Sequence, residues 1–179
     1  PARDYIVVGR ERHTPAQEAP SMVGYPARAI RTDGWLYIMN LESHRWPAGV
    51  PENATHPADT YTDCDGGPTK DFIVAHRDEE EYRRFYELSF AKRPADELYD
   101  LRDDPIQMTN LAGDNAYHEV KQSLRNELMS YLRQTEDPRF TDDPVRFDDY
   151  PYRVGYLDEE RLKKLRKQQR SGKHLTPPF

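Results

Sequence analysis

The run from Gly9 to His13 carries the side chains best suited to chemistry in this sequence. It reads Gly-Arg-Glu-Arg-His and directly follows the apolar run Tyr5–Val8, which is typical of a strand. Loops at the carboxyl ends of strands are where α/β proteins bind ligands. Two guanidinium groups, a carboxylate and an imidazole there can bind an anionic, hydroxyl-rich ligand, because arginine offers a planar fork of donors. The alternative is that Arg10 and Arg12 only form ion pairs with acidic loops.

Three other groups of polar residues are weaker candidates. The six histidines show no i, i+4 pair and no cluster with the single cysteine, which argues against a zinc site. That cysteine, Cys64, would need a neighbouring base to act as a nucleophile, and we interpret it as a bystander. Hard cations need several oxygens that converge from one loop, and three Asp pairs lack that context. We interpret these pairs as turn carboxylates: Asp103-Asp104, Asp142-Asp143 and Asp148-Asp149.

Composition narrows the class of protein. The 179 residues carry a net charge of −6, with 36% hydrophobic residues, 11% aromatic residues and 15 prolines. The acidic balance argues against a nucleic-acid-binding protein, and no apolar run reaches the roughly 18 residues of a membrane span. The aromatic content is too high for a disordered chain, so we expect a modest core under long loops. The basic segment 161–173 is interpreted as the solvated face of a tail helix over 157–170, with attraction for a polyanion as the alternative.

A β-hairpin is the strongest local prediction. The strand-like runs Ala29–Thr32 and Trp35–Met39 flank Asp33-Gly34. Asp-Gly between two strands is typical of a type I′ turn, which needs positive φ at both positions. The second run is apolar on both faces, so each face needs a cover. The run 5–8, with three β-branched residues and a tyrosine, is predicted as a strand buried on both faces.

Helices are predicted where apolar residues recur at helical spacing. The segments 79–90 and 115–135 fit that spacing. Either Asp114 or Asn115 can cap the longer helix, and Thr69 could cap a short helix that continues to residue 76.

Together these elements indicate an α+β fold. A short strand is predicted over 97–101, and prolines break any regular pattern across 41–70. We expect a small antiparallel sheet around the Asp33-Gly34 hairpin, packed by the long helix near 115–135. A long irregular loop region and an extended C-terminal tail complete the prediction.

Several motifs resemble the C-terminal part of type I sulfatases. Leu98–Leu101, which reads Leu-Tyr-Asp-Leu, is followed by Asp-Pro and then Asn-Leu-Ala, an order fairly specific to sulfatases. The stretch through Glu136–Pro138 is most similar to the heparan N-sulfatase (sulfamidase) branch. The resemblance covers residues 3 to about 140. Its other motifs are Gly9–His13, Tyr25–Ile38, Gly67–Lys70, His76–Asp78 and Lys92–Ala95.

The resemblance implies a piece of a larger α/β sulfatase fold. Residues 1–24 would complete an N-terminal domain, 25–139 would form the C-terminal subdomain, and 140–179 an extended or partly helical tail. Sulfatases carry a Cys-x-Pro/Ser-x-Arg motif whose cysteine becomes formylglycine, and the residues after Cys64 do not match it. By resemblance, formylglycine, Ca²⁺ and the catalytic residues belong to an N-terminal portion outside this chain. We therefore expect no catalytic residue, metal ligand or cofactor here, and no activity from this chain by itself.

The resemblance also places Glu11, Arg12 and His13 at the substrate mouth, as substrate-binding residues. The leading hypothesis is the C-terminal fragment of a sulfatase similar to N-sulfoglucosamine sulfohydrolases, which hydrolyses a sulfate ester or sulfamate on a glycosaminoglycan or other sulfated glycan. Its partners would be the N-terminal sulfatase domain and that glycan, in the periplasm, outside the cell or, in a eukaryote, in the lysosome. The alternative is a non-catalytic module that binds acidic glycans or a partner chain.

Overall fold

The computed structural model describes residues 4–14, 16–17, 23–51, 60–145 and 147–150. The chain divides into two compact units. The first comprises Pro1–Glu11, Tyr25–His44 and Arg93–Arg146, and the second comprises Arg12–Gly24, Arg45–Lys92 and Phe147–Phe179. In the described ranges, no helix has both the length and the apolar character to span a membrane.

A four-stranded antiparallel sheet forms the centre of the first unit. Its strands lie in the order β1-β2-β3-β4, with every neighbouring pair antiparallel. The predicted hairpin is confirmed as β2 and β3, and β4 begins and ends one residue earlier than predicted. The strands are β1 (Tyr5–Arg10), β2 (Ala27–Thr32), β3 (Trp35–Asn40) and β4 (Asp96–Asp100).

The turn of the hairpin differs from the predicted type I′ turn. Left-handed φ values in the described chain are confined to Gly49, Tyr61, Gln107 and Glu136, so Asp33-Gly34 does not adopt the left-handed backbone that type I′ requires. A side chain closes the turn instead, because the Trp35 amide donates to Thr32 Oγ1 at 3.0 Å. The prediction of a hairpin was right and that of its turn type was wrong.

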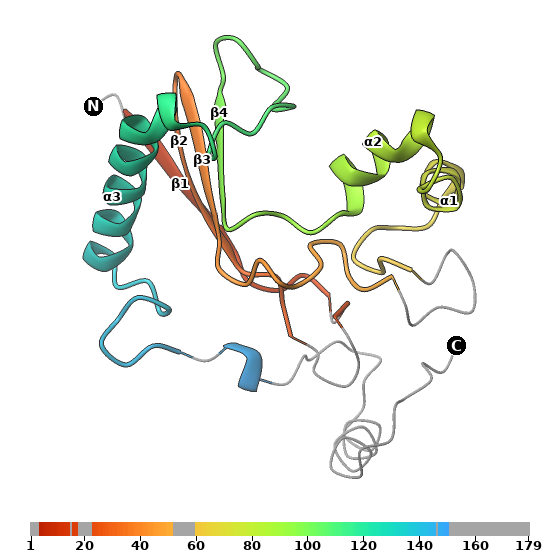
Figure 1. Ribbon diagram of the computed structural model, residues 1–179. Helices are drawn as coiled ribbons and strands as arrows, with labels where there is room; N and C mark the ends of the chain where they lie inside the picture. The colour runs from red at the N-terminus through yellow and green to blue at the C-terminus, as the bar shows by residue number, and fades with distance from the viewer. Residues whose placement is uncertain (1–3, 15, 18–22, 52–59, 146, 151–179) are drawn as a thin grey trace. The chain divides into compact units, whose positions relative to one another are not determined.

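A long helix packs across one face of the sheet (Figure 1). The helix α3 (His118–Gln134) follows the 3₁₀ turn η2 (Asn115–Tyr117). Asp114, one of the two predicted caps, caps this turn by accepting from the Ala116 amide at 2.8 Å, whereas α3 itself begins after Tyr117 without a side-chain cap. This arrangement confirms the predicted α+β fold class. The buried residues between helix and sheet include Ile30, Tyr37, Met39, Leu98, Ala112, Leu124, Leu128 and Leu132.

The first strand is not buried on both faces, contrary to the prediction. Tyr5 and Val7 pack against the core, whereas Ile6 and Val8 on the opposite face are 49% and 55% exposed. The reason is position, because β1 is an edge strand that pairs only with β2 and the helix covers one face of the sheet. Residues 5–10 thus belong to the same sheet as the hairpin. The domain boundaries at residues 24 and 139 stay predictions.

The described residues of the second unit form two α-helices and a small aromatic core. The helices are α1 (Pro68–Ala75) and α2 (Glu80–Phe90), and Tyr61, Val74 and Phe90 are buried with them. The predicted Thr69 cap is wrong, because α1 begins one residue earlier, at Pro68, after Gly67 as N-cap. Proline suits the first helical position because its φ is already fixed near the helical value.

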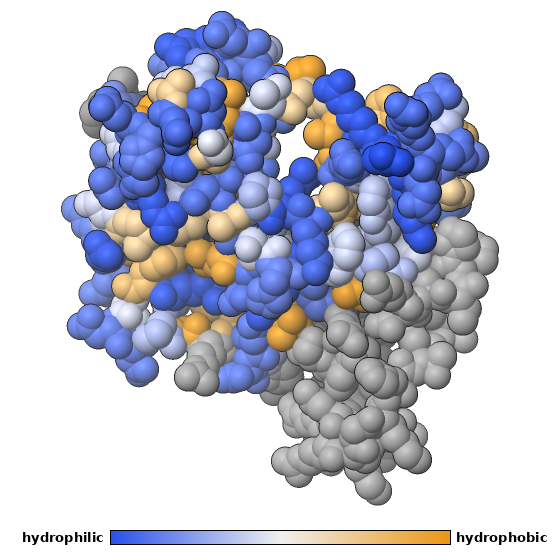
Figure 2. All heavy atoms as spheres, in the orientation of Figure 1, coloured by the Kyte–Doolittle hydropathy of each residue, from blue (hydrophilic) through white to orange (hydrophobic). Residues whose placement is uncertain are grey.

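The region after α3 is described only in part. The 3₁₀ turn η3 (Phe147–Asp149) belongs to the second unit, and the predicted tail helix at 157–170 and its basic segment at 161–173 lie outside the described residues. On the face drawn in Figure 2, hydrophilic residues predominate and apolar residues form only small groups.

Candidate functional site

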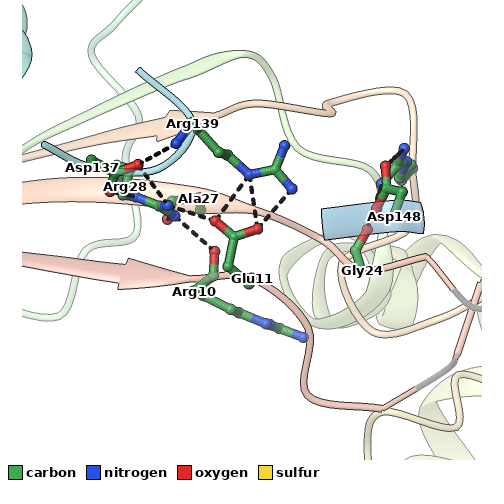
Figure 3. A network of polar contacts seen from close by, with 9 residues as sticks. Arg10, Glu11, Gly24, Ala27, Arg28, Asp137, Arg139 and Asp148 are labelled. Atoms are coloured by element: carbon green, nitrogen blue, oxygen red, sulfur yellow. Dashed lines mark hydrogen bonds and ion pairs between the residues drawn. The ribbon is translucent and has the colours of Figure 1, made fainter. Parts of the chain in front are cut away.

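Two arginines hold the carboxylate of Glu11 in the sheet unit. Arg28 Nη2 lies 2.5 Å from Glu11 Oε1. Arg139 approaches the same carboxylate through Nε, 2.9 and 2.8 Å from its two oxygens, and through Nη2, 2.7 Å from Oε2 (Figure 3). Glu11 follows the last residue of β1, so these ion pairs fix the point at which the chain leaves the sheet.

Arg28 also binds Asp137, which completes a network of two arginines and two carboxylates. Its Nε lies 2.7 Å from Asp137 Oδ2, and its Nη1 donates to the carbonyls of Arg10 and Ala27 at 3.1 and 3.0 Å. Burial tends to raise the pKa of Asp137, but the hydrogen bond from Arg28 and the contacts with Arg139 outweigh burial and lower it. The carboxylate of Asp137 is therefore held in its charged form by the neighbouring guanidinium groups.

His13 and Thr14 meet the carboxylate of Asp63 in the second unit. His13 Nδ1 and Thr14 Oγ1 each lie 2.7 Å from Asp63 Oδ1. The side chain of His13 is 74% exposed and that of Asp63 is 6% exposed. An exposed imidazole is therefore anchored on a nearly buried carboxylate, an arrangement that orients a histidine for hydrogen bonding or proton transfer.

Arg12 contacts the start of the C-terminal region. Its two Nη atoms donate to the carbonyl of Tyr150 at 3.2 and 3.1 Å. Nearby in the sequence, Asp148 accepts from Arg45 at 2.7 Å, and Arg45 also donates to the carbonyl of Gly24 at 2.9 Å. Asp148, from one of the predicted turn pairs, is thus part of an ion pair within the second unit.

The three predicted site residues are divided between the two units. Glu11 lies in the first unit, and Arg12 and His13 lie together in the second. Asp63 was not predicted as a partner for His13, because 50 residues of sequence separate the two. Arg28 was also missed, although a charged residue on the strand face that carries Ile30 is a recognisable signal of a buried ion pair.

The described residues do not fit a metal ion or a formylglycine. No group of three or more His, Cys, Asp or Glu side chains in this part of the chain is placed to hold a metal. Cys64 is partly buried, and its thiol donates to the carbonyl of Asp65 at 3.7 Å.

The sequence is similar to part of a known sulfatase. It is 27% identical over 118 residues to the ulvan-active sulfatase of Formosa agariphila, a match that covers 63% of this chain and 18% of that protein. It is also 34% identical over 56 residues to an uncharacterized protein of Haemophilus influenzae, covering 31% of this chain and 29% of that protein. No family model matches the chain. The first match supports homology with that sulfatase, and it covers less than a fifth of the length of that protein.

Two solved structures are similar to the chain over most of its length. One is a candidate sulfatase from Bacteroides thetaiotaomicron, with a TM-score of 0.43 and 17% identity, and the other is a 2-O GAG sulfatase, with a TM-score of 0.43 and 18% identity. They cover 85% and 84% of this chain, and the chain covers 21% of each.

Proposed function

We propose that this chain is the C-terminal portion of a sulfatase that hydrolyses a sulfate ester or sulfamate on a sulfated glycan. The observation that carries this proposal is the 118-residue match with the ulvan-active sulfatase. The motif order from Leu98 to Ala112 supports the same conclusion, and the similarity through Glu136–Pro138 favours the heparan N-sulfatase branch and a sulfamate substrate. Such an enzyme would act in the periplasm, outside the cell or in a lysosome.

In this proposal the chain supplies scaffold and substrate contacts, not the reacting groups. Formylglycine and Ca²⁺ belong to the N-terminal domain, which is the chain's principal partner. The sheet unit, with its own buried core between α3 and the strands, gives that domain a rigid neighbour.

The residues proposed to contact the glycan are Glu11, Arg12 and His13. The exposed imidazole of His13 suits a sulfate or carboxylate oxygen, and the guanidinium of Arg12 adds positive charge beside it. The two arginines that hold Glu11 neutralise its charge, so it does not repel an anionic ligand, and its oxygens can still accept from a sugar hydroxyl.

The test is steady-state kinetics of the full-length enzyme carrying His13→Ala. We expect KM for an N-sulfated glucosamine oligosaccharide to rise several-fold with kcat little changed, because the lost contact serves binding. His44→Ala is the matched control, since the His44 side chain is also 74% exposed and belongs to no proposed site. Unchanged kinetics in His13→Ala would refute the substrate-binding role.

Two further measurements separate this proposal from its alternative. The 179-residue chain by itself should not hydrolyse an aryl sulfate, and any turnover would contradict the assignment of the nucleophile to another domain. A non-catalytic module would bind sulfated oligosaccharides without that domain, whereas a sulfatase portion gains its full affinity only in the full-length enzyme. Comparing sulfate release from N-sulfated and O-sulfated oligosaccharides decides between the sulfamate and the ester.

A further inference from the structure

We propose that Asp63 is a positioning residue for His13, an inference that rests on the proposed glycan-binding role of that histidine. The carboxylate of Asp63 fixes Nδ1 of the imidazole at 2.7 Å. A carboxylate accepts a hydrogen bond and has none to give when ionised, so Nδ1 must carry the proton. The nitrogen offered to a ligand is then Nε2.

The exposures of the two side chains fit this division of roles. Asp63, at 6%, is placed where a ligand cannot reach its carboxylate directly, while His13, at 74%, is accessible. Asp63 therefore acts through the imidazole. With Nδ1 protonated, Nε2 of the neutral ring accepts from a hydroxyl or sulfamate N–H, and Nε2 of the protonated ring donates to a sulfate oxygen.

The backbone around Asp63 holds its carboxylate in place. The Asp63 amide donates to the Ala48 carbonyl at 3.0 Å, and the Tyr61 amide donates to the Val50 carbonyl at 3.2 Å. The Cys64 amide closes the turn by donating to the Tyr61 carbonyl at 2.9 Å. Tyr61 is fully buried and has a positive φ of 49°, a backbone conformation that persists only where the surroundings enforce it.

A buried lysine ties the same turn to helix α1. Lys70, on the first turn of α1, is 5% exposed, and its Nζ donates to the carbonyls of Tyr61 and Cys64 at 3.2 and 2.7 Å. These two carbonyls lie on either side of Asp63 in the chain. The lysine thus fixes both ends of the turn from Tyr61 to Cys64, which carries the Asp63 side chain that holds His13.

A second histidine–carboxylate pair in the same unit is less restrained than the pair of His13 and Asp63. His76 Nδ1 lies 2.6 Å from Glu79 Oε1, but Glu79 is three residues away and its side chain is 58% exposed. Exposed pairs of this kind hold their partners weakly. Glu79→Gln is therefore a matched control for substitutions of Asp63.

The experiment measures the protonation of the imidazole nitrogens in the 179-residue chain and glycan binding in the full-length enzyme. Two-bond ¹H–¹⁵N correlation spectra, assigned with His13→Ala, report which nitrogen of neutral His13 carries the proton. We expect the Nδ1–H form in the wild-type chain, a reduced preference in Asp63→Asn and loss of the preference in Asp63→Ala. Circular dichroism and thermal melts identify any variant that fails to fold, and Asp63→Asn keeps the size of the side chain if Asp63→Ala does not fold.

Binding is measured by calorimetry with a heparin tetrasaccharide as the probe. We expect both Asp63 variants to raise Kd several-fold, and by no more than His13→Ala does, because Asp63 acts through the imidazole. We expect Glu79→Gln to leave Kd unchanged. An unchanged tautomer, or an altered tautomer with unchanged Kd, in a folded Asp63 variant would overturn the positioning role. A wild-type Kd in His13→Ala would instead show that the proposed binding role itself is wrong.

Discussion

Arg28 and Asp137 form an ion pair across 109 residues of sequence, with Arg28 Nε 2.7 Å and Nη2 3.2 Å from the two carboxylate oxygens. The pair joins strand β2 to the loop that follows helix α3. The same guanidinium binds Glu11, so one buried side chain links the end of β1, the start of β2 and the C-terminal side of the helix. Gly9 makes room for it, because a Cβ at that position would lie 3.0 Å from Arg28 Cδ.

Replacing Arg28 by methionine should destabilise the sheet unit strongly. The change leaves the carboxylate of Asp137 nearly buried without its cation, and breaking a buried pair in this way costs about 3–5 kcal/mol. Urea denaturation of the chain measures the loss. Arg102→Met is the control. The side chain of Arg102 is exposed although it pairs with Asp100 at 2.6 Å, so its replacement should cause a much smaller loss of stability. Equal losses in the two variants would contradict a special role for Arg28.

The stability of the sheet unit should fall in acid, partly through Asp137. Its pKa is lowered from 3.8 in the folded chain, so the folded state binds fewer protons than the unfolded state near that pH. The resulting stabilisation is present above pH 3.8 and is lost as pH falls through the lower, folded value. Asp137→Asn should flatten this part of the pH profile in urea titrations between pH 2 and 6. Asp100, whose pKa is also lowered, leaves a residual dependence of the same sign.

Removing the hydroxyl group from two buried tyrosines should change the stability of the chain in opposite directions. Within the described part of the chain, Tyr25 Oη is buried without a hydrogen-bond partner, so Tyr25→Phe removes an unsatisfied group and should raise stability by up to about 1–3 kcal/mol. Tyr99 Oη donates to Glu97 Oε2 at 2.5 Å. Tyr99→Phe therefore leaves a buried carboxylate oxygen unsatisfied and should lower the stability of the chain. Thermal melts at pH 7 measure both, and a loss of stability in Tyr25→Phe would contradict the prediction.

Alkaline titration provides a second check on Tyr25. Burial, together with the nearby carboxylate of Glu97, raises its pKa to about 12. The contribution of Tyr25 to stability is therefore present below its ordinary pKa of 10 and is lost as pH rises from 10 through 12. Absorbance at the phenolate wavelength should show one fewer late-titrating tyrosine in Tyr25→Phe than in the wild-type chain.

The segment whose Ala48 carbonyl accepts from the Asp63 amide should not tolerate a side chain at Gly49. Its φ is +97°, and a Cβ there would lie 2.7 Å from the Cβ and 2.8 Å from the carbonyl oxygen of Ala16. Gly49→Ala should cost at least about 1–3 kcal/mol from backbone strain alone and should disturb the NMR signals of His13. Gly66→Ala, which meets no atom within 4 Å, is the matched control and should leave those signals in place.

The local features of this fold were determined by the sequence alone. Asp33-Gly34 between two strand-like runs predicted the hairpin, and the apolar stripe over 115–135 predicted the helix that covers one face of the sheet. Each of these signals is short-range, since turn preference, helical spacing and capping depend on residues a few positions apart. The sequence also identified Arg12 and His13 as candidates for ligand binding, by residue type and position after a strand.

Tertiary structure decided how those residues are held. That Asp63 anchors His13, and that Arg28 joins Glu11 to Asp137, depends on which buried atoms meet after the chain has folded. The exposure of Ile6 and Val8 depends likewise on the edge position of β1. The geometry of the hairpin turn depends on the Thr32 hydroxyl, which the Asp-Gly pattern does not take into account. Long-range pairs leave no periodic trace in sequence, because their energy comes from desolvation and contact geometry that only the folded chain creates.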